Sequence, residues 1–209
     1  MEYRAAESPS EILRACGMVY DAFLRQGLIP PDPSRIYVHH EALVNPACVA
    51  VALEDDGRMV ATAGGILDGP GGLPLDREYP DEMAVLRAVL RAGHTVAECG
   101  VIASDSPTSL RTMMGVISVL LSWGREFGAT AVVTSCHPHH ATFYTRGYGL
   151  RQVGPERHYE RLSGAPVVML AGVLAEMAAQ SDLRGVRHWR EHPADLSRLM
   201  EPARLREVA

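Results

Sequence analysis

Apolar residues recur along the chain with two different spacings, and these spacings predict a domain that mixes helices and strands. After Ser8, apolar side chains return at steps of three and four residues, which is typical of one face of a helix. Ser8 as N-cap, Pro9 at the first helical position and Glu11 form a capping box that predicts where this helix begins. Gly27 and the proline-rich stretch at 30–33 predict its end.

Short apolar runs separated by turn residues predict the strands. The Asp56-Gly57 pair is a strong hairpin signal, and it joins two of these runs into an antiparallel pair. The glycine-rich piece at 69–74 does not follow the strand–helix pattern of a dinucleotide site, so we interpret it as a loop. The predicted strands are residues 2–6, 48–53, 59–67, 95–103, 131–136 and 166–171.

Two further helices are predicted between these strands. One covers residues 80–92 and is ended by Gly93. The other begins with Ser106-Pro107, a cap residue followed by proline, and ends near Gly128. Because this second helix is apolar on nearly all sides, we expect it to be buried on most of them.

The chain changes character near residue 172. Its 209 residues fit one domain with a small appendage. Residues 1–172 hold all the predicted strands, whereas residues 173–209 spread apolar side chains among arginine, glutamate and histidine. We predict one α/β domain over residues 1–172. Over residues 173–209 we predict a tail of short amphipathic helices, docked on the domain or on a partner.

Composition narrows the class of function. The chain has 20 basic and 25 acidic residues, and the net charge of −5 argues against a general nucleic-acid binder. Hydrophobic residues make up 47% of the chain, which is ordinary for a globular protein. No apolar run approaches the roughly 18 residues of a membrane span, and no signal-peptide pattern is present. The four cysteines lack C-x-x-C spacing, so we predict reduced thiols in a cytoplasmic protein.

The segment 95–150 carries the candidate chemistry. It predicts a strand, a helix and a strand, with polar residues where the two strands end, and an open α/β sheet usually places its ligand there. Glu98 is the only ionisable residue between Val96 and Ser104. A carboxylate at the end of a strand can act as a base if burial raises its pKa. The alternative is a structural carboxylate at a strand edge or paired with an arginine.

The end of this segment resembles a known family. Residues 137–150 read His-Pro-His-His-Ala-Thr-Phe-Tyr-Thr-Arg-Gly-Tyr-Gly-Leu. This pattern resembles the C-terminal signature of GNAT-fold acyltransferases, above all that of the long-chain N-acyl amino acid synthases, which are relatives of the acyl-homoserine lactone synthases. Residues 72–82 and then Val96-Ala97-Glu98 are similar to the same family in the same order, and the likeness covers about residues 35–172. The resemblance implies a GNAT-like α/β fold, a twisted mixed sheet with helices on both faces.

The resemblance also implies a reaction. A fatty acyl group would move from acyl carrier protein, or from acyl-CoA, to the amine of an amino acid or similar small molecule. Glu98 would be the base. Tyr144 matches the tyrosine that many GNAT enzymes aim at the thioester sulfur, and a phenol can protonate a leaving thiolate; alternatively, its hydroxyl caps a local hydrogen bond. His140 falls where the related synthases carry histidine, which implies substrate positioning or helix packing.

The chain departs from the family at one position. The family pattern reads Glu-x-Ser-Arg, and here it reads Glu98-Cys99-Gly100-Val101. In the relatives the arginine would orient the glutamate or bind an anionic group of the acceptor. Arg111 and Arg146 are the candidates to replace it. The neighbouring His137, His139 and His140 lack a cysteine, aspartate or glutamate at ligand spacing, so we predict no metal site.

The expected acyl-donor loop gives the remaining predictions. GNAT enzymes that use coenzyme A commonly carry a Gln/Arg-x-x-Gly-x-Gly/Ala loop whose N–H groups hold the pyrophosphate. Residues 104–111 lack these glycines, Pro107 removes an N–H group, and Asp105 would repel a phosphate. This favours a carrier-protein donor whose phosphopantetheine arm enters the cleft without the nucleotide, and no permanently bound cofactor. The predicted contacts to the acyl donor are Val101, Ile102, Ala103, Ser104 and Arg111.

The methionine-rich helix that follows this loop would suit a long acyl chain if it lines the cleft, although methionines that only fill the core are the simpler interpretation. Two other functions stay open. One is an acetyl-CoA-dependent GNAT N-acetyltransferase. The other is a catalytically silent GNAT-like module that binds a ligand or partner through its tail.

Overall fold

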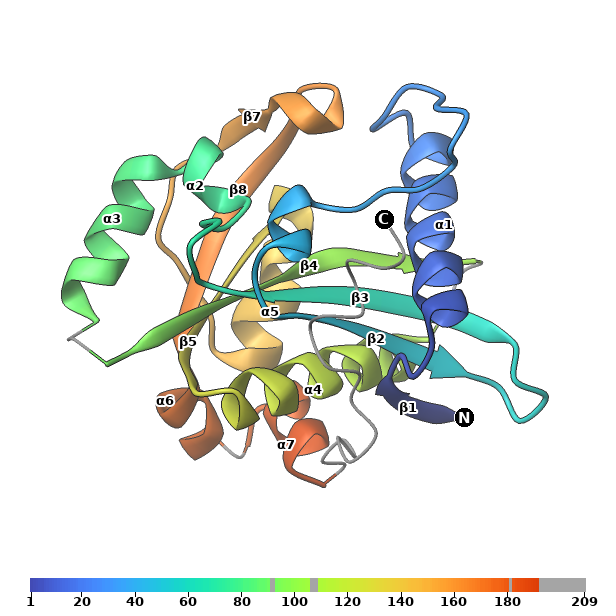
Figure 1. Ribbon diagram of the computed structural model, residues 1–209. Coiled ribbons are helices and arrows are strands. Elements are labelled where there is room, and N and C mark those ends of the chain that lie inside the picture. Colours follow the sequence, from blue (N-terminus) through green and yellow to red (C-terminus); the bar gives the residue numbers. More distant parts are fainter. Residues whose placement is uncertain (91–92, 106–108, 181, 192–209) are drawn as a thin grey trace.

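The computed structural model describes residues 1–90, 93–105, 109–180 and 182–191. Its sheet has eight strands, with helices on both faces (Figure 1). The strand order is β1-β2-β3-β4-β5-β8-β6, and β7 pairs with β8. Within the described residues the β4–β5 pair is parallel and the other strand pairs are antiparallel. The predicted mixed sheet, covered on both faces, is confirmed.

The long strands lie where apolar runs predict them, and the β2–β3 hairpin turns at Asp56-Gly57. Two short strands, β6 and β7, are additional to the predicted ones, and each of them pairs with the apolar strand β8. The strands are β1 (Glu2–Ala5), β2 (Ala47–Leu53), β3 (Met59–Leu67), β4 (Thr95–Ser104), β5 (Ala129–Cys136), β6 (Arg151–Gln152), β7 (Arg157–Tyr159) and β8 (Ala165–Val173).

The helices follow the predicted order, with additions in the connections. The α-helices are α1 (Pro9–Arg25), α2 (Leu75–Glu78), α3 (Pro80–Val89), α4 (Leu110–Glu126), α5 (Ala141–Tyr148), α6 (Leu174–Ala179) and α7 (Arg184–Glu191). Short 3-10 helices are η1 (His40–Leu43), η2 (Pro138–His140) and η3 (Glu160–Leu162). No helix of the described residues combines the length and the apolar character needed to cross a membrane.

The start of α4 differs from the prediction. Ser109, not Ser106, is the N-cap, and its Oγ accepts a hydrogen bond from the Thr112 N–H at 3.1 Å. Ser109 lies three residues before Thr112, which is the spacing of an N-cap serine. It therefore competes as a helix start with the Ser106-Pro107 signal upstream. Residues 106–108, which include Pro107, lie outside the described residues, as do residues 91–92 at the predicted end of α3.

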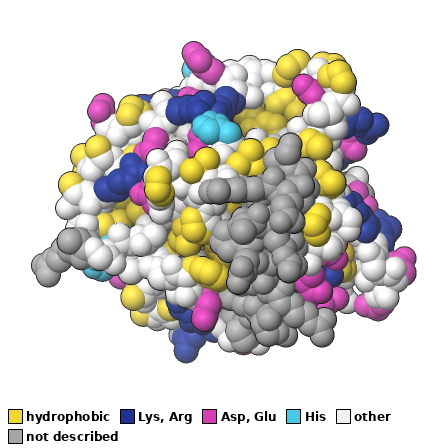
Figure 2. Space-filling model, in the orientation of Figure 1, with side chains coloured by type: hydrophobic (Ala, Val, Ile, Leu, Met, Phe, Trp, Pro, Cys, Tyr) yellow, Lys and Arg dark blue, Asp and Glu magenta, His cyan; other side chains and the backbone are white. Residues whose placement is uncertain are grey.

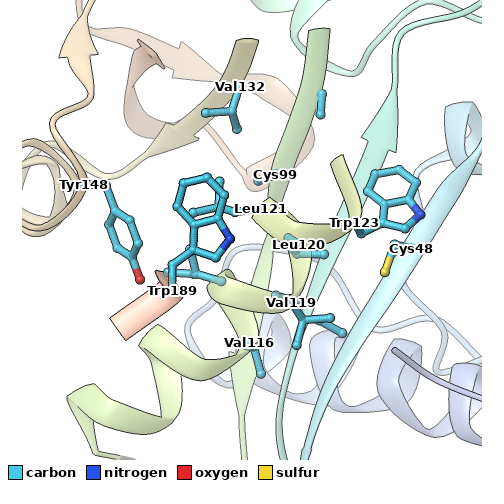
Figure 3. Packing of buried hydrophobic residues seen from close by; sticks show 14 of the residues in the cluster. Cys48, Cys99, Val116, Val119, Leu120, Leu121, Trp123, Val132, Tyr148 and Trp189 are labelled. Carbon is cyan, nitrogen blue, oxygen red and sulfur yellow. The ribbon is translucent and has the colours of Figure 1, made fainter. Parts of the chain in front are cut away.

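Two separate layers of helix cover the sheet. Helices α1, α2 and α3 lie on one face, and α4, α6 and α7 lie on the other (Figure 1). Helix α4 is buried over most of its surface, as its apolar sequence predicts, and Figure 3 shows its side chains packed among strand residues. The largest buried side chain of α4 is Trp123, which lies near Cys48 of β2.

The described part of the segment after residue 172 packs on the domain. Helix α7 contacts α4 and α5. Trp189 of α7 is 2% exposed, and its indole N–H donates to Ser122 Oγ of α4 at 3.1 Å. This helix therefore completes the core on the α4 face of the sheet.

Candidate active site

The sheet opens between its two parallel strands. Strands β4 and β5 pair from Thr95/Ala129 to Glu98/Val133, and beyond this point β4 continues beside β3 while β5 continues beside β8. The edge of β4 that faces β5 therefore has no strand partner past Glu98. An unpaired strand edge presents backbone N–H and C=O groups to which an extended ligand inserted between the two strands can bind.

A bulge bends β4 beside this opening. The β3–β4 register shifts between Thr62 and Gly64, and Val101 has a φ of 46°. A β-branched residue rarely adopts this left-handed conformation, which is a feature of strained functional sites. Gly64 makes room for it, because a Cβ atom there would lie 2.5 Å from Val101 Cγ2. Val101 is the residue that stands where the family resemblance implies an arginine.

The opening leads into a cavity of about 270 Å³ between the two strands. Three predicted catalytic residues, Glu98, Tyr144 and His140, all line it, as do Val101 and Ile102 of the predicted donor contacts. We call it the central cavity. The other lining residues include Phe23, Leu28, Tyr37, His39, Thr134, Cys136, Tyr159 and Val167.

Two apolar cavities adjoin the central cavity. One, of about 70 Å³, lies beneath α1 and shares Tyr37, His39 and Glu98 with the central cavity. The other, of about 20 Å³, lies against α4 and α5 and shares Ile102, Thr134 and Tyr144 with it. We call them the α1 cavity and the α4 cavity. The central cavity thus joins apolar spaces at its Glu98 side and at its Tyr144 side.

Glu98 is held at the floor of this arrangement. It is 8% exposed, and its Oε2 accepts a hydrogen bond from the Leu75 N–H at 3.0 Å. Burial raises the pKa of Glu98 to about 8, and the charges of Glu41 and Asp76 raise it as well, whereas the Leu75 hydrogen bond and the charge of Arg161 lower it. A carboxyl group with this pKa can accept a proton near neutral pH, which suits a general base.

An ion-pair network fixes the segment whose Leu75 N–H group donates to Glu98. Arg87 of α3 bonds Asp68 and Asp76 with both ends of its guanidinium, at N–O distances between 2.5 and 3.0 Å. Asp76 Oδ2 also accepts from the Leu73 N–H at 2.7 Å, which fixes the turn into α2. The segment 72–82, singled out by its family likeness, therefore positions Leu75 against the buried carboxyl.

Tyr144 lies on the other side of the central cavity, on α5. Burial raises the pKa of its phenol, so the hydroxyl stays protonated at neutral pH and can donate a proton. Its ring packs edge-on against Phe143 at 4.9 Å. The geometry is compatible with the predicted role of an acid toward a leaving thiolate.

His140 is exposed at the rim of the central cavity. Its ring packs at a tilt against His139 with centroids 4.0 Å apart, and His139 packs in the same way against His137 at 4.2 Å. Burial lowers the pKa of His140, and the neighbouring histidines lower it further. Within the part of the chain that the structure describes, no group of three histidine, cysteine or acidic side chains is arranged to hold a metal ion.

The remaining predicted donor contacts lie away from the central cavity. Ala103 packs against α1, and the Ser104 carbonyl accepts from Arg25 at 3.2 Å. Arg111 is exposed in the first turn of α4. The Asp105 carboxylate pairs with Arg58 at 2.5 Å, so the charge that we expected to repel a phosphate has a counter-charge.

Sequence reasoning missed a basic cluster beside the cavity. It consists of His39, His40, Arg77 and Arg161, grouped around the buried Glu41. These residues come from three segments far apart in the sequence and show no periodic pattern. All 20 basic residues of the chain are arginines, and the sequence contains no lysine.

A sheet opened at a bulged strand, with a buried carboxyl at the opening and a tyrosine across it, defines an acyltransferase of the GNAT-like fold. The family of the N-acyl amino acid synthase FeeM matches residues 14–172. The chain belongs to this family, and it is an N-acyltransferase. The predicted family, fold and enzyme class are confirmed.

Solved structures agree. The chain is similar to FeeM, an N-acyl amino acid synthase from uncultured soil microbes, with 27% identity, a TM-score of 0.73, and coverage of 88% of this chain and 96% of that one. It shares the fold of MesI, a CoA-dependent acyl-homoserine lactone synthase (16% identity, TM-score 0.60, 91% and 94% covered). It also shares that of ribosomal-protein-alanine N-acetyltransferase from Brucella melitensis (14%, 0.56, 83% and 99%). A search of curated protein sequences gives no significant match.

Proposed function

We propose that the protein transfers a fatty acyl group from acyl carrier protein, or from acyl-CoA, to the amine of an amino acid or similar small molecule. The observation that carries this proposal is the placement of Glu98, a buried carboxyl with a raised pKa at the point where β4 and β5 separate. A base there meets an amine that approaches a thioester inserted between the strands.

The reaction divides between the two sides of the central cavity. The amine gives a proton to Glu98 and attacks the thioester carbonyl carbon, so that a C–N bond forms and the C–S bond breaks. Tyr144 gives its proton to the leaving thiolate, and the proton held by Glu98 returns to the phenolate through solvent. The free edge of β4 at Val101 and Ile102 supplies N–H groups to the pantetheine and to the developing oxyanion.

We place the acyl chain against α4, where the α4 cavity lies beside Tyr144, because this leaves the Glu98 side for the acceptor. The cavity holds only about 20 Å³, so the surrounding side chains must move apart to admit a long chain. Ile117 and Leu121 of α4 line it, together with Met177 of α6. The methionines of α4 do not line it, and Met114 fills the core. The contact that we propose between α4 and a long acyl chain thus depends on Ile117 and Leu121, and not on the methionines.

Two observations support the finer parts of the proposal. The sequence of residues 104–111 lacks the glycines of a coenzyme A loop, which favours acyl carrier protein as the acyl donor. All four cysteines are free, which supports the cytoplasmic location that we propose. No observation favours the acetyl-CoA enzyme or the silent binding module.

Mass spectrometry of lipid extracts tests the proposal. Cells expressing the wild type should contain N-acylated amino acids or amines that cells expressing Glu98→Gln lack, because glutamine cannot accept the proton. Purified protein should then be assayed with acyl carrier protein and coenzyme A thioesters of the same chain length. Equal product from the wild type and from folded Glu98→Gln would contradict the role of Glu98, and absence of product from both would contradict the reaction.

A further inference from the structure

One residue of the basic cluster lies beside the reacting groups. We call His39, His40, Arg77 and Arg161 the basic rim, and Figure 2 shows arginine and histidine side chains together beside apolar surface on this face of the molecule. Of these four residues His39 alone lines the cavities, and it lines both the central cavity and the α1 cavity together with Glu98. The His39 ring is therefore next to the space in which the amine and the thioester would meet.

A hydrogen bond from Arg161 fixes the tautomer of His39. Arg161 Nη1 lies 3.3 Å from His39 Nδ1. Because a guanidinium only donates, Nδ1 must accept, and the one ring hydrogen of a neutral imidazole is then on Nε2. Burial lowers the pKa of His39 to about 4, and the charge of Arg161 lowers it as well, whereas the charge of Glu41 raises it. The ring therefore stays neutral at physiological pH.

Neighbouring groups also fix the orientation of this ring. Tyr37 packs edge-on against it with ring centroids 5.5 Å apart, and Tyr37 in turn packs against Phe23 of α1 at 4.9 Å. Arg161 also contacts His40, with 3.2 Å between Arg161 Nη2 and His40 Nδ1. No group of the described residues accepts a hydrogen bond from His39 Nε2. An oriented N–H donor is thus available to a bound substrate.

The fixed tautomer distinguishes His39 from the other uncharged donors of the central cavity. Tyr37 and Tyr159 line the same cavity, but a phenol hydrogen rotates about the C–O bond, so that a hydroxyl can accept as well as donate. His39 Nε2 only donates while Arg161 bonds Nδ1. His39 is therefore unsuited to take the proton of the amine, and that role stays with Glu98.

We propose that the Nε2–H group of His39 donates a hydrogen bond to the carbonyl oxygen of the acyl thioester. When the amine attacks the carbonyl carbon, the C=O electron pair moves onto this oxygen, and His39 binds the oxyanion beside the N–H groups of β4. The C=O bond forms again as the C–S bond breaks, and His39 keeps its proton throughout. A neutral imidazole suits this task, because it polarises a carbonyl without giving up a proton. The inference rests on the proposed function and adds a catalytic residue to it.

Arg161 strengthens this donor from outside the cavity. Among the described residues no arginine lines the central cavity or the α1 cavity, and this includes Arg111 and Arg146, the candidates to replace the arginine of the family. A cation that donates to Nδ1 draws electron density from the ring and makes Nε2–H a better donor. Arg161 is thus a positioning residue that acts on the thioester through His39.

Nuclear magnetic resonance tests the tautomer without any substrate. In protein with isotope-labelled histidine, the His39 ring should carry its hydrogen on Nε2, and the signals that His39→Gln removes identify this ring. A neutral wild-type ring with the hydrogen on Nδ1, or a ring that is charged at pH 7, would overturn the inference.

Infrared spectroscopy tests the contact with the thioester. The probe is decanoyl-N-acetylcysteamine with an isotope-labelled carbonyl, bound without any amine. Its C=O stretch should have a lower frequency on the wild type than on His39→Leu, with Arg161→Met between them, because a stronger hydrogen bond weakens the C=O bond. The control is His94→Leu, which removes an exposed histidine that lines neither cavity and should match the wild type. Equal frequencies on the wild type and His39→Leu would overturn the inference.

Turnover is compared through the N-acylated products in lipid extracts of cells that express equal amounts of each folded variant. His39→Leu should lower product formation about 100- to 1,000-fold, as expected for loss of one oxyanion donor. His39→Gln should stay within about tenfold of the wild type, because its side-chain N–H can reach the same position. With purified protein and the amine found in these products, the loss in His39→Leu should appear in kcat more than in KM for the thioester.

The measurements separate this inference from the proposed function. Equal losses of turnover in His39→Leu and His39→Gln would overturn the role of His39 while leaving the acyl transfer in place. A wild type that makes no N-acylated product but lowers the C=O frequency through His39 would contradict the proposed function, and the contact between His39 and the thioester would stand.

Discussion

Two arginine clusters act on Glu98, and they are built in opposite ways. In one, Arg87 bonds two carboxylates with short contacts at both ends of its guanidinium. In the other, the basic rim formed by His39, His40, Arg77 and Arg161, the two arginines contact imidazole rings and share the distant carboxylate of Glu41. The closed Arg87 network therefore indicates a structural role. Arg77 and Arg161, which are 51% and 28% exposed, have N–H groups that face solvent and that a ligand can reach.

The two clusters also affect the pKa of Glu98 with opposite sign. Asp76 of the Arg87 network raises it, and Arg161 of the basic rim lowers it. Burial remains the first cause of the raised value. Ionising Glu98 therefore costs free energy. The carboxyl lies between the Arg87 network and the basic rim.

The largest expected effect is the cost of ionising Glu98. Its pKa is about 8 in the folded protein and near 4.5 for an ordinary glutamate, so the stability that its protonated form provides is present below pH 4.5 and is lost as pH rises to 8. Glu98→Gln should therefore gain roughly 3–5 kcal/mol over the wild type between pH 4.5 and pH 9. Urea denaturation at several pH values measures this. Glu126→Gln, which removes an exposed carboxylate, is the control.

A flat difference between Glu98→Gln and wild type across that pH range would show that Glu98 ionises without cost. The base would then lack the desolvated environment on which the proposed chemistry depends.

The next largest effect is on the free energy of unfolding when the Arg87 network is broken. Arg87→Met leaves Asp68 and Asp76 without their partner, and because these groups are partly exposed we expect a loss of about 1–3 kcal/mol in the free energy of unfolding. Arg161→Gln should cost clearly less, because Arg161 makes no close contact with a carboxylate. Urea denaturation at pH 7 compares the two variants. A larger loss for Arg161→Gln would reverse the assignment of a structural role to Arg87 and of a positioning role to Arg161.

The smallest effect is on the pH dependence of catalysis. In the wild type, kcat/KM should rise with an apparent pKa near 8, because Glu98 must be deprotonated to act. Asp76→Asn should move this midpoint down and Arg161→Gln should move it up, each by about half a unit, since a negative neighbour is removed in one and a positive neighbour in the other. The same amine acceptor is used for every variant, so its own titration is common to all profiles.

Shifts of the same sign for Asp76→Asn and Arg161→Gln would show that the two clusters do not act on Glu98 through their charges. The control is Arg151→Gln, which should keep the wild-type midpoint.

Most of the fold could be predicted from the sequence, because the strongest local signals agree with the final packing. The capping box at Ser8 and the Asp56-Gly57 turn both appear in the structure, with Ser8 accepting from the Glu11 N–H at 3.3 Å. The strand that holds Glu98 was found from its apolar neighbours. The start of α4 was missed because two serines offer similar caps and local chemistry does not choose between them.

The candidate site was only partly predictable. Glu98 and Tyr144 lie in a strand and a helix with clear patterns, and the structure brings both to one cavity. His39 and Arg161 are 122 residues apart and lie in irregular segments, so nothing local indicates that they meet. The candidates for the missing arginine, Arg111 and Arg146, were chosen because they lie near the motif. Arg161 contacts His39 because η3, which connects β7 to β8, lies beside the η1 region.

The exclusive use of arginine has a consequence for an enzyme that handles activated acyl groups. A thioester reacts with any uncharged amine within reach, and a lysine side chain near the opening would compete with the acceptor for the acyl group. Guanidinium groups remain protonated at any pH in which the protein is folded and do not act as nucleophiles. A chain of 209 residues without a lysine offers its own acyl donor no side-chain amine, so positive charge can be placed beside the reacting bond without forming an amide on the enzyme itself.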